Sequence, residues 1–250
     1  MVKQLTQQRV LVIDYLRTLA LVLMILYHLV YDLDQWTTLN LDVDAPYWFV
    51  VGKTAALLFI FLSGLSSGFS KRAVKNGLRV LFFGMIITVV TYIIFPEQYV
   101  RFGILHFLGV MLLLYPLLRR LPNSVLIFAT VLALSLGFYF SEVVVHTHLA
   151  LPLGLMYPGF SSMDYYPLFP YSGATFLGIL AYRYFFATSR ELKGNIENPA
   201  SNKEHHMSSN TYKKRAADPI FTWISRHSLA IYLIHQPVLL AIILGIGFLL

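Results

Sequence analysis

The sequence contains no cysteine and little charge of either sign. The lack of cysteine excludes disulfides, cysteine nucleophiles and thiolate metal sites, and it leaves the redox compartment undetermined. Charged residues make up only 12% of the chain, whereas they make up about 25% of a typical soluble domain. Hydrophobic residues account for 57%, and the mean hydropathy is +0.66. The composition therefore excludes an ordinary soluble protein and indicates a polytopic membrane protein.

Apolar runs long enough to cross a bilayer as helices recur along all 250 residues. This length accommodates about seven spans with their loops and leaves no room for a second, soluble domain. We predict an all-α fold, a polytopic transmembrane helix bundle that forms a single domain over residues 1–250. The expected spans are residues 10–30, 47–69, 78–95, 103–118, 124–141, 167–187 and 228–249.

The formal net charge of +7 would suggest a nucleic-acid partner in a soluble chain, but here we expect none. Basic residues gather in every second connection between spans, so the positive-inside rule places the N-terminus in the cytoplasm and the C-terminus outside. Short loops fit a multi-pass protein of a bacterial plasma membrane. The first acidic connection holds Asp32, Asp34, Asp42 and Asp44; the basic ones hold Lys71, Arg72, Lys75 and Arg79, then Arg119 and Arg120, then Arg190, Lys193, Lys203, Lys213, Lys214 and Arg215.

Two segments invite other interpretations. The first apolar run is too long for a signal peptide, carries charges and lacks a small-residue cleavage site, so we expect a retained helix. The polar segment 188–218 is rich in Ser, Asn and Lys and is predicted to be disordered. It contains His205 and His206, which we interpret as solvated side chains, and no metal site is expected.

Ionisable side chains lie along one face of the first span. Asp14, Arg17, His28 and Asp32 are separated by about one, three and one helical turns, so they project from a common stripe. Each such group costs a few kcal/mol at membrane depth, so the default interpretation is a functional group that faces the protein interior. A rise of about 1.5 Å per residue places Arg17 roughly 16 Å from His28 along the helix.

The later spans carry further candidates, each with a structural alternative. His106 opens the fourth span, and a histidine at a helix end is more often a hydrogen-bonded interfacial group than a catalyst. Asp164 precedes the sixth span among aromatic anchors. His235 lies inside the last span before Pro237, which should kink that helix, and an interhelical hydrogen bond explains His235 equally well. Small residues at 63–68, including Gly64 and Gly68, favour close helix packing over a catalytic part.

Five motifs follow one another in fixed order over nearly the whole chain. They are IDYLRTLALVLMILYH, LFIFLSG, GILHFLGV, DYYPLFPYSGATFLG and SRHSLAIYLIHQPVL. In this combination the chain resembles the bacterial branch of the heparan-α-glucosaminide N-acetyltransferase catalytic-domain family. The element formed by Arg17 and His28 with a later SG pair is also similar to membrane acyltransferases that modify surface polysaccharides. Thr18 departs from the family, which usually has glycine after the arginine.

The resemblance implies transfer of an acetyl or other short acyl group from cytoplasmic acyl-CoA, a co-substrate, to a glycan or lipid-linked acceptor outside. His28 would be the general base or a transient acyl carrier, oriented by Asp32. Arg17 would pair with a phosphate or pantetheine carbonyl of acetyl-CoA, with Asp14 holding the guanidinium. The expected partners are membrane lipid and the acceptor, and a homodimer is compatible with the chain. His106, Asp164 and His235 would line the acceptor side or shuttle protons.

Other functions stay open from the residues alone. The charged stripe could be a buried polar network that only fixes helix packing, although such a network does not explain the presence of His28 in the span. A proton-coupled transporter or flippase could relay protons through the same side chains, but the sequence lacks the matching broken helices and repeat symmetry of many transporters. A membrane scaffold would predict that replacement of His28 changes nothing measurable. Binding of acetyl-CoA would distinguish the enzyme from the transporter and from the scaffold.

Overall fold

The computed structural model of the chain describes residues 2–39, 41–187 and 219–249. Helices account for 77% of it, and these ranges contain no β-strand, which confirms the all-α class. The segment 188–218, predicted to be disordered, lies outside the described residues together with His205 and His206.

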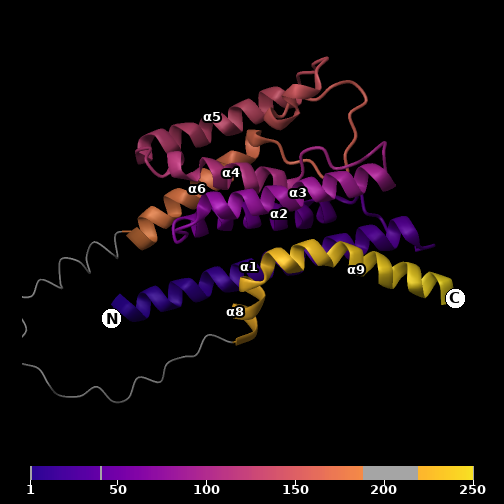
Figure 1. Cartoon of the computed structure of the whole chain (residues 1–250), viewed down its shortest axis with the longest axis horizontal. Helices are drawn as coiled ribbons and strands as arrows, with labels where there is room; N and C mark the ends of the chain where they lie inside the picture. Colours follow the sequence, from indigo (N-terminus) through magenta and orange to yellow (C-terminus); the bar gives the residue numbers. More distant parts are fainter. Residues whose placement is uncertain (1, 40, 188–218, 250) are drawn as a thin grey trace, which may run out of the picture. The chain divides into compact units, whose positions relative to one another are not determined.

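A helix occupies each of the seven predicted spans (Figure 1). Five helices are long and apolar enough to cross a membrane, and α4 is a shorter apolar helix, as expected of a multi-pass membrane protein. Their orientation across the bilayer stays a prediction. The seven are α1 (Val2–Trp36), α2 (Pro46–Ser67), α3 (Ala73–Ile94), α4 (Ile104–Leu118), α5 (Asn123–Ser141), α6 (Leu168–Tyr182) and α9 (Ser228–Leu249).

Several predicted boundaries are wrong. Helix α1 continues past residue 30 to Trp36. It therefore includes Asp32, as the predicted stripe requires, and also Asp34, which was expected in the connection after the span. Helix α3 begins at Ala73, ahead of the predicted start at residue 78, and so includes Lys75 and Arg79. Hydropathy underestimates helices whose ends are charged. In α3 the basic residues fit the helix because Lys and Arg are good helix formers that extend their charged heads toward water.

Two short helices, η1 and α8, were not predicted, and a third, η2, lies within the predicted span 167–187. A 3₁₀-helix, η1, covers His148–Leu153, a π-helix, η2, continues α6 over Arg183–Ala187, and α8 covers Pro219–Arg226. A helix as short as α8 is not stable alone and depends on packing, which its local pattern does not reveal. Helix α8 packs against α1.

The chain divides into two compact units, with the division inside α2. Unit 1 comprises Met1–Leu58 and Phe185–Leu250, and it contains α1, the start of α2, α8 and α9. Unit 2 comprises Phe59–Tyr184, with the end of α2 and the helices α3 to α6. The single domain over residues 1–250 stays a prediction.

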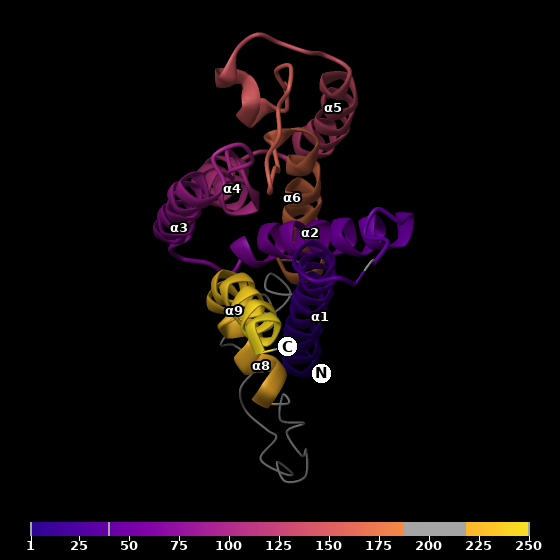
Figure 2. The same ribbon diagram turned by 90° about the vertical axis from the view of Figure 1, so that its right-hand side faces the viewer.

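Unit 2 contains two helical hairpins, α3 beside α4 and α5 beside α6 (Figures 1 and 2). Each hairpin packs through small side chains. On α3 the buried residues include Gly77 and Gly84, and a methyl group added at Gly84 would lie 3.3 Å from the His106 ring on α4. The outer face of α5 is apolar and exposed, with Phe128 at 67% and Phe138 at 77%. Lipid rather than water suits such a face.

Helices α2 and α6 approach closely in unit 2. A Cβ atom on Gly64 would lie 2.3 Å from the backbone oxygen of Thr175, and one on Gly178 would lie 2.2 Å from that of Phe61. No real side chain tolerates such distances. The predicted role of the small residues of α2 in close packing is therefore confirmed.

In unit 1, α1 packs along α8 and α9 (Figures 1 and 2). The rings of Tyr15 on α1 and Phe221 on α8 lie 4.6 Å apart between centroids. Pro237 lies inside α9, where it removes one N–H group from the helical ladder. The polar side chains of α1 lie along this packed surface.

Candidate functional site

Three contacts join the polar stripe of α1 to α8 and α9. A guanidinium nitrogen of Arg17 donates to the Ser225 hydroxyl of α8 at 2.9 Å. The rings of His28 and His235 lie edge to face, with centroids 4.8 Å apart. The Asp32 carboxylate accepts from the side-chain amide of Gln236, the neighbour of His235 on α9. The common face predicted from the helical spacing of Arg17, His28 and Asp32 is therefore confirmed, whereas their roles stay predictions.

The backbone of each helix sets the tautomer of its histidine. The Nδ1 atom of His28 lies 2.9 Å from the carbonyl oxygen of Met24, and that of His235 lies 2.6 Å from the carbonyl oxygen of Tyr232. A carbonyl only accepts, so Nδ1 carries the proton in both rings. In the neutral ring the lone pair is then on Nε2, the nitrogen that can act as a base.

The basic nitrogen of His235 is buried and, within the described residues, has no hydrogen-bond partner. The same holds for the side-chain oxygen of Gln236. Both atoms are acceptors, so a bound group with N–H or O–H donors would satisfy them. The amide groups of a pantetheine arm and the hydroxyl or amine of an acceptor both have such donors. The residues present are therefore compatible with any ligand that brings such donors.

The carboxylate of Asp32 is hydrogen-bonded to Gln236 and not to His28. The carboxylate is 1% exposed, and its two oxygens accept from the Gln236 amide at 2.8 and 3.0 Å. The predicted orientation of His28 by a direct bond from Asp32 is wrong for the described structure, in which Met24 orients the ring. Helical side chains lean toward the N-terminus, so the His28 ring points back toward Met24 and away from Asp32.

Arg17 lies at the α8 end of the stripe. Its partner Ser225 is 2% exposed, and the charge of Asp14 acts on the guanidinium. That Asp14 holds the guanidinium in place stays a prediction. Thr18, the departure from the family pattern, is buried and donates to the backbone oxygen of Asp14 at 2.9 Å. Threonine therefore satisfies its own hydroxyl inside the helix.

His106 and Asp164 belong to unit 2, where both serve the N-terminus of α4. The backbone N–H of Gly103 donates to Nδ1 of His106, and Nε2 of His106 lies 3.2 Å from the Thr88 hydroxyl. Thr88 gives its own proton to the oxygen of Val100, so Nε2–H of His106 is the donor to Thr88. Both ring nitrogens are thus occupied. This geometry favours the hydrogen-bonded structural alternative, and the catalytic role of His106 stays a prediction.

Asp164 caps the same helix from a distant part of the chain. Its carboxylate accepts from the backbone N–H of Ile104 at 2.9 Å, where a negative charge is favourable. The next residue, Tyr165, donates its hydroxyl proton to the oxygen of Leu151 at 2.7 Å, and burial raises the pKa of Tyr165 to about 12. Tyr165 therefore stays protonated near neutral pH. Asp164 and Tyr165 thus each anchor the connection before α6 by a hydrogen bond to another part of the chain.

Sequence reasoning missed the partners on α8 and α9. Ser225 and Gln236 meet Arg17 and Asp32, and the hydroxyl of Thr222 is a further buried group without a partner in the described part of the chain. The signal for Gln236 was present, because a glutamine beside a histidine is costly inside an apolar helix. Ser225 left no such signal, since a lone serine is common anywhere.

The chain was compared with known protein families, with curated proteins and with solved structures. The family described as "Heparan-alpha-glucosaminide N-acetyltransferase, catalytic" matches residues 9–237, a range that includes the stripe of α1 and the His235–Gln236 pair. No curated protein and no solved structure matches the chain.

Proposed function

The chain belongs to the heparan-alpha-glucosaminide N-acetyltransferase catalytic family, and from this premise we propose that it transfers an acetyl group from cytoplasmic acetyl-CoA to an acceptor outside the membrane. The acceptor is a hydroxyl or amine of a glycan or a lipid-linked sugar. The protein acts as a multi-pass enzyme of a bacterial plasma membrane. The family supports a membrane acetyltransferase, and the donor, acceptor and direction are inferred from charge, topology and site chemistry.

The observation that carries the proposal is the His28–His235 pair inside two helices long enough to span a membrane. Both histidines have Nδ1 fixed by a backbone carbonyl, which leaves the lone pair on Nε2. A merely structural histidine does not need a buried, unsatisfied nitrogen such as Nε2 of His235, which costs about 1–3 kcal/mol. The arrangement suits a base that receives a proton during acyl transfer.

The transfer step balances with His28 as the base. Nε2 of His28 takes the proton of the acceptor hydroxyl or amine, and the acceptor atom bonds to the thioester carbonyl carbon. The carbon–sulfur bond then breaks, and the CoA thiolate leaves with the proton from His28. In the covalent route Nε2 of His28 bonds to the carbonyl carbon while the carbon–sulfur bond breaks and the CoA thiolate leaves. The acceptor atom then bonds to the same carbon, the carbon–nitrogen bond to His28 breaks, and the acceptor's proton passes to Nε2 of His235.

The neighbouring residues have supporting roles in the proposal. Arg17 binds a phosphate or pantetheine carbonyl of the donor, and Asp14 balances its charge. Asp32 positions Gln236, whose unsatisfied oxygen accepts a hydrogen bond from the substrate. His235 shares the proton with His28 or binds the donor.

The test is acetyl transfer by the full chain in proteoliposomes, with radiolabelled acetyl-CoA on the basic-loop side and a panel of glycans on the other. His28→Ala should lower turnover at least about 100-fold, the usual contribution of a general base. His227→Ala is the matched control, because His227 also bonds a helix carbonyl, that of Trp223, but is exposed. Full turnover by His28→Ala would remove the base assignment, and substrate movement without acetylation would favour a transporter.

A further inference from the structure

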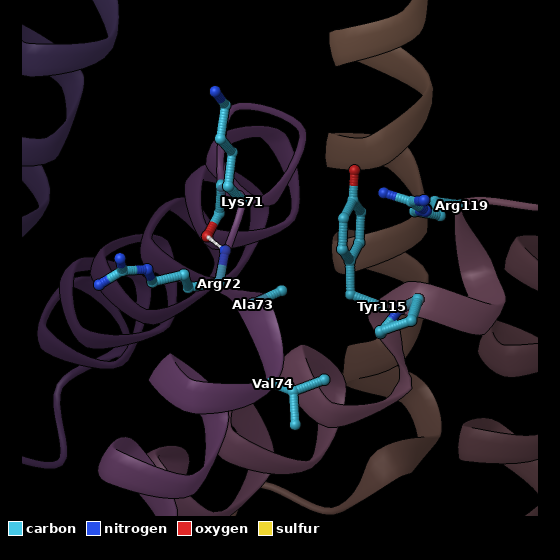
Figure 3. A pocket seen from close by; sticks show the side chains of 8 residues that line it. Lys71, Arg72, Ala73, Val74, Tyr115 and Arg119 are labelled. Carbon is cyan, nitrogen blue, oxygen red and sulfur yellow. Dashed lines mark hydrogen bonds between the residues drawn. The ribbon is translucent and has the colours of Figure 1, made fainter.

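A small cavity in unit 2 carries a positive charge that the proposed chemistry does not use. Its volume is about 140 Å³, and it lies where the connection between α2 and α3 meets the end of α4 (Figure 3). Lys71 and Arg72 line it from the first segment, and Tyr115 and Arg119 line it from the second. No Asp or Glu lines it.

The three cations of this cavity lack protein partners. Within the described residues, no hydrogen bond or ion pair joins the side chains of Lys71, Arg72 or Arg119 to another group. The C-terminal carbonyls of α4 do not need Arg119, because Arg183 already donates to the backbone oxygens of Leu118 and Arg119 at 3.2 and 3.1 Å. The charges of the cavity are therefore available to an anion.

The N-terminus of α3 adds to this field. Helix α3 has no side-chain cap and no acidic residue in its first turn, and its first residue, Ala73, lines the cavity. The nearby Ser70 hydroxyl instead accepts from the backbone of Arg72. The unpaired N–H groups and positive dipole end of a helix attract phosphate, and here they coincide with three cations.

Tyr115 gives the cavity a fixed wall. The side chain is 8% exposed and is hydrogen-bonded to Ser67. Since Ser67 gives its own proton to the oxygen of Gly64, the Tyr115 hydroxyl is the donor to Ser67. Figure 3 shows the Tyr115 ring beside Arg119, with Lys71 and Arg72 across from it. The charged ends of Lys71 and Arg72 extend outward from the cavity, away from the ring, whereas Arg119 lies beside it.

We propose that this cavity is a phosphate-binding site formed by Lys71, Arg72, Arg119 and the N-terminus of α3. The inference rests on the proposed function in one respect, namely that the phosphate is that of the nucleotide end of the CoA donor. The basic residues lie in connections expected on the cytoplasmic side, where acyl-CoA is found. The positive-inside rule explains the charges themselves, but it requires neither a cavity nor an uncapped helix end beside them.

The experiment measures binding of adenosine 3′,5′-bisphosphate to the full chain in phosphatidylcholine nanodiscs. Lys71→Gln combined with Arg119→Gln should weaken binding about tenfold or more, as expected when charged hydrogen bonds are lost. Lys75→Gln combined with Arg79→Gln is the matched control, because it removes one Lys and one Arg from exposed positions of α3 outside the cavity. The control should change binding less than about twofold, since solvent and salt screen distant charges.

A second arm separates the sources of phosphate. Nanodiscs that contain phosphatidylglycerol report whether the cavity variant loses retained anionic lipid. Loss of lipid retention with no bisphosphate binding in the wild type would support the site with a lipid headgroup as its source. Equal behaviour of the cavity and control variants in both arms would overturn the proposal.

Failure of the proposed function would look different. His28→Ala should keep bisphosphate binding within about twofold of the wild type, since it lies outside the cavity. If the wild type binds bisphosphate through the cavity but acetylates no acceptor, the phosphate site stands and the acetyltransferase proposal falls.

Discussion

Unit 1 and unit 2 each hold a histidine with a buried ring nitrogen in an apolar helix, but the hydrogen bonding of the two histidines differs. In unit 2 both nitrogens of His106 have partners, the Gly103 amide and the Thr88 hydroxyl. In unit 1 one nitrogen of His235 binds a helix carbonyl, and the other is buried with no partner in the described structure. A satisfied histidine stabilises the fold, whereas an unsatisfied one retains a lone pair for a proton or a substrate. Burial alone therefore does not identify a catalytic histidine, but the state of its second nitrogen helps to.

The sharpest test of this comparison replaces His235. His235→Ala should lower acetyl turnover about 10- to 100-fold, because the second proton-accepting nitrogen beside His28 is lost. The thermal unfolding midpoint in detergent should change little, since the ring's described hydrogen bonds, to the backbone of Tyr232 and Ile231, are local to α9. Turnover and unfolding should be measured on the same preparation. Unchanged turnover would leave His28 as the sole base and make His235 a packing residue.

The reverse result is expected in unit 2. His106→Ala should destabilise the protein by about 1–3 kcal/mol, because it leaves the Gly103 N–H and the Thr88 hydroxyl without their histidine partner. Turnover per folded molecule should stay near the wild-type value, as measured by the transfer assay after correction for folded fraction. His106→Gln, which can both donate and accept, should recover part of the stability. A loss of turnover at unchanged stability would instead give His106 the predicted catalytic role.

An effect of similar size is expected in unit 1 at Asp32, whose carboxylate has a hydrogen-bond partner. Gln236→Ala removes the only described hydrogen-bond partner of the buried Asp32 carboxylate, and it should cost about 1–3 kcal/mol of stability. Denaturation of the detergent-solubilised protein measures this cost. The double variant Asp32→Asn with Gln236→Ala should be more stable than Gln236→Ala alone, because it contains no buried carboxylate that has lost its hydrogen-bond partner. Equal stabilities would show that the carboxylate finds another partner.

The smallest effect concerns the other end of the stripe. Arg17→Lys should raise the KM for acetyl-CoA about tenfold or less with little change in kcat, because the planar fork of the guanidinium is lost while its charge remains. Ser225→Ala is the companion variant, since it removes the α8 partner of Arg17 and leaves the arginine. It should change the KM less than Arg17→Lys does. An unaltered KM in Arg17→Lys would move donor binding away from α1.

Most of the helical fold could be predicted, and only part of the site. Helices occupy all seven predicted spans, because a long apolar run has few alternatives in a membrane. The start of α3, the end of α1 and the whole of α8 were mispredicted, since charged helix ends and short packed helices carry weak local signals.

The common face of Arg17, His28 and Asp32 followed from helical spacing, because residues one or several whole turns apart always share a face. The partners of that face did not follow, since Gln236 lies 204 positions from Asp32 along the chain and Ser225 lies 208 from Arg17. The same limit hid the capping role of Asp164, whose partner Ile104 is 60 positions away.

The amino-acid sequence by itself determined that this protein is a membrane helix bundle, which positions carry its ionisable groups, and which loops are basic. These properties depend on the composition of short windows of chain, so they need no knowledge of distant neighbours. Only the tertiary structure decided which histidine keeps an unsatisfied nitrogen, which carboxylate caps a helix and which cations surround a cavity. A hydrogen bond acts over about 3 Å, so its outcome depends on groups that folding alone brings within reach.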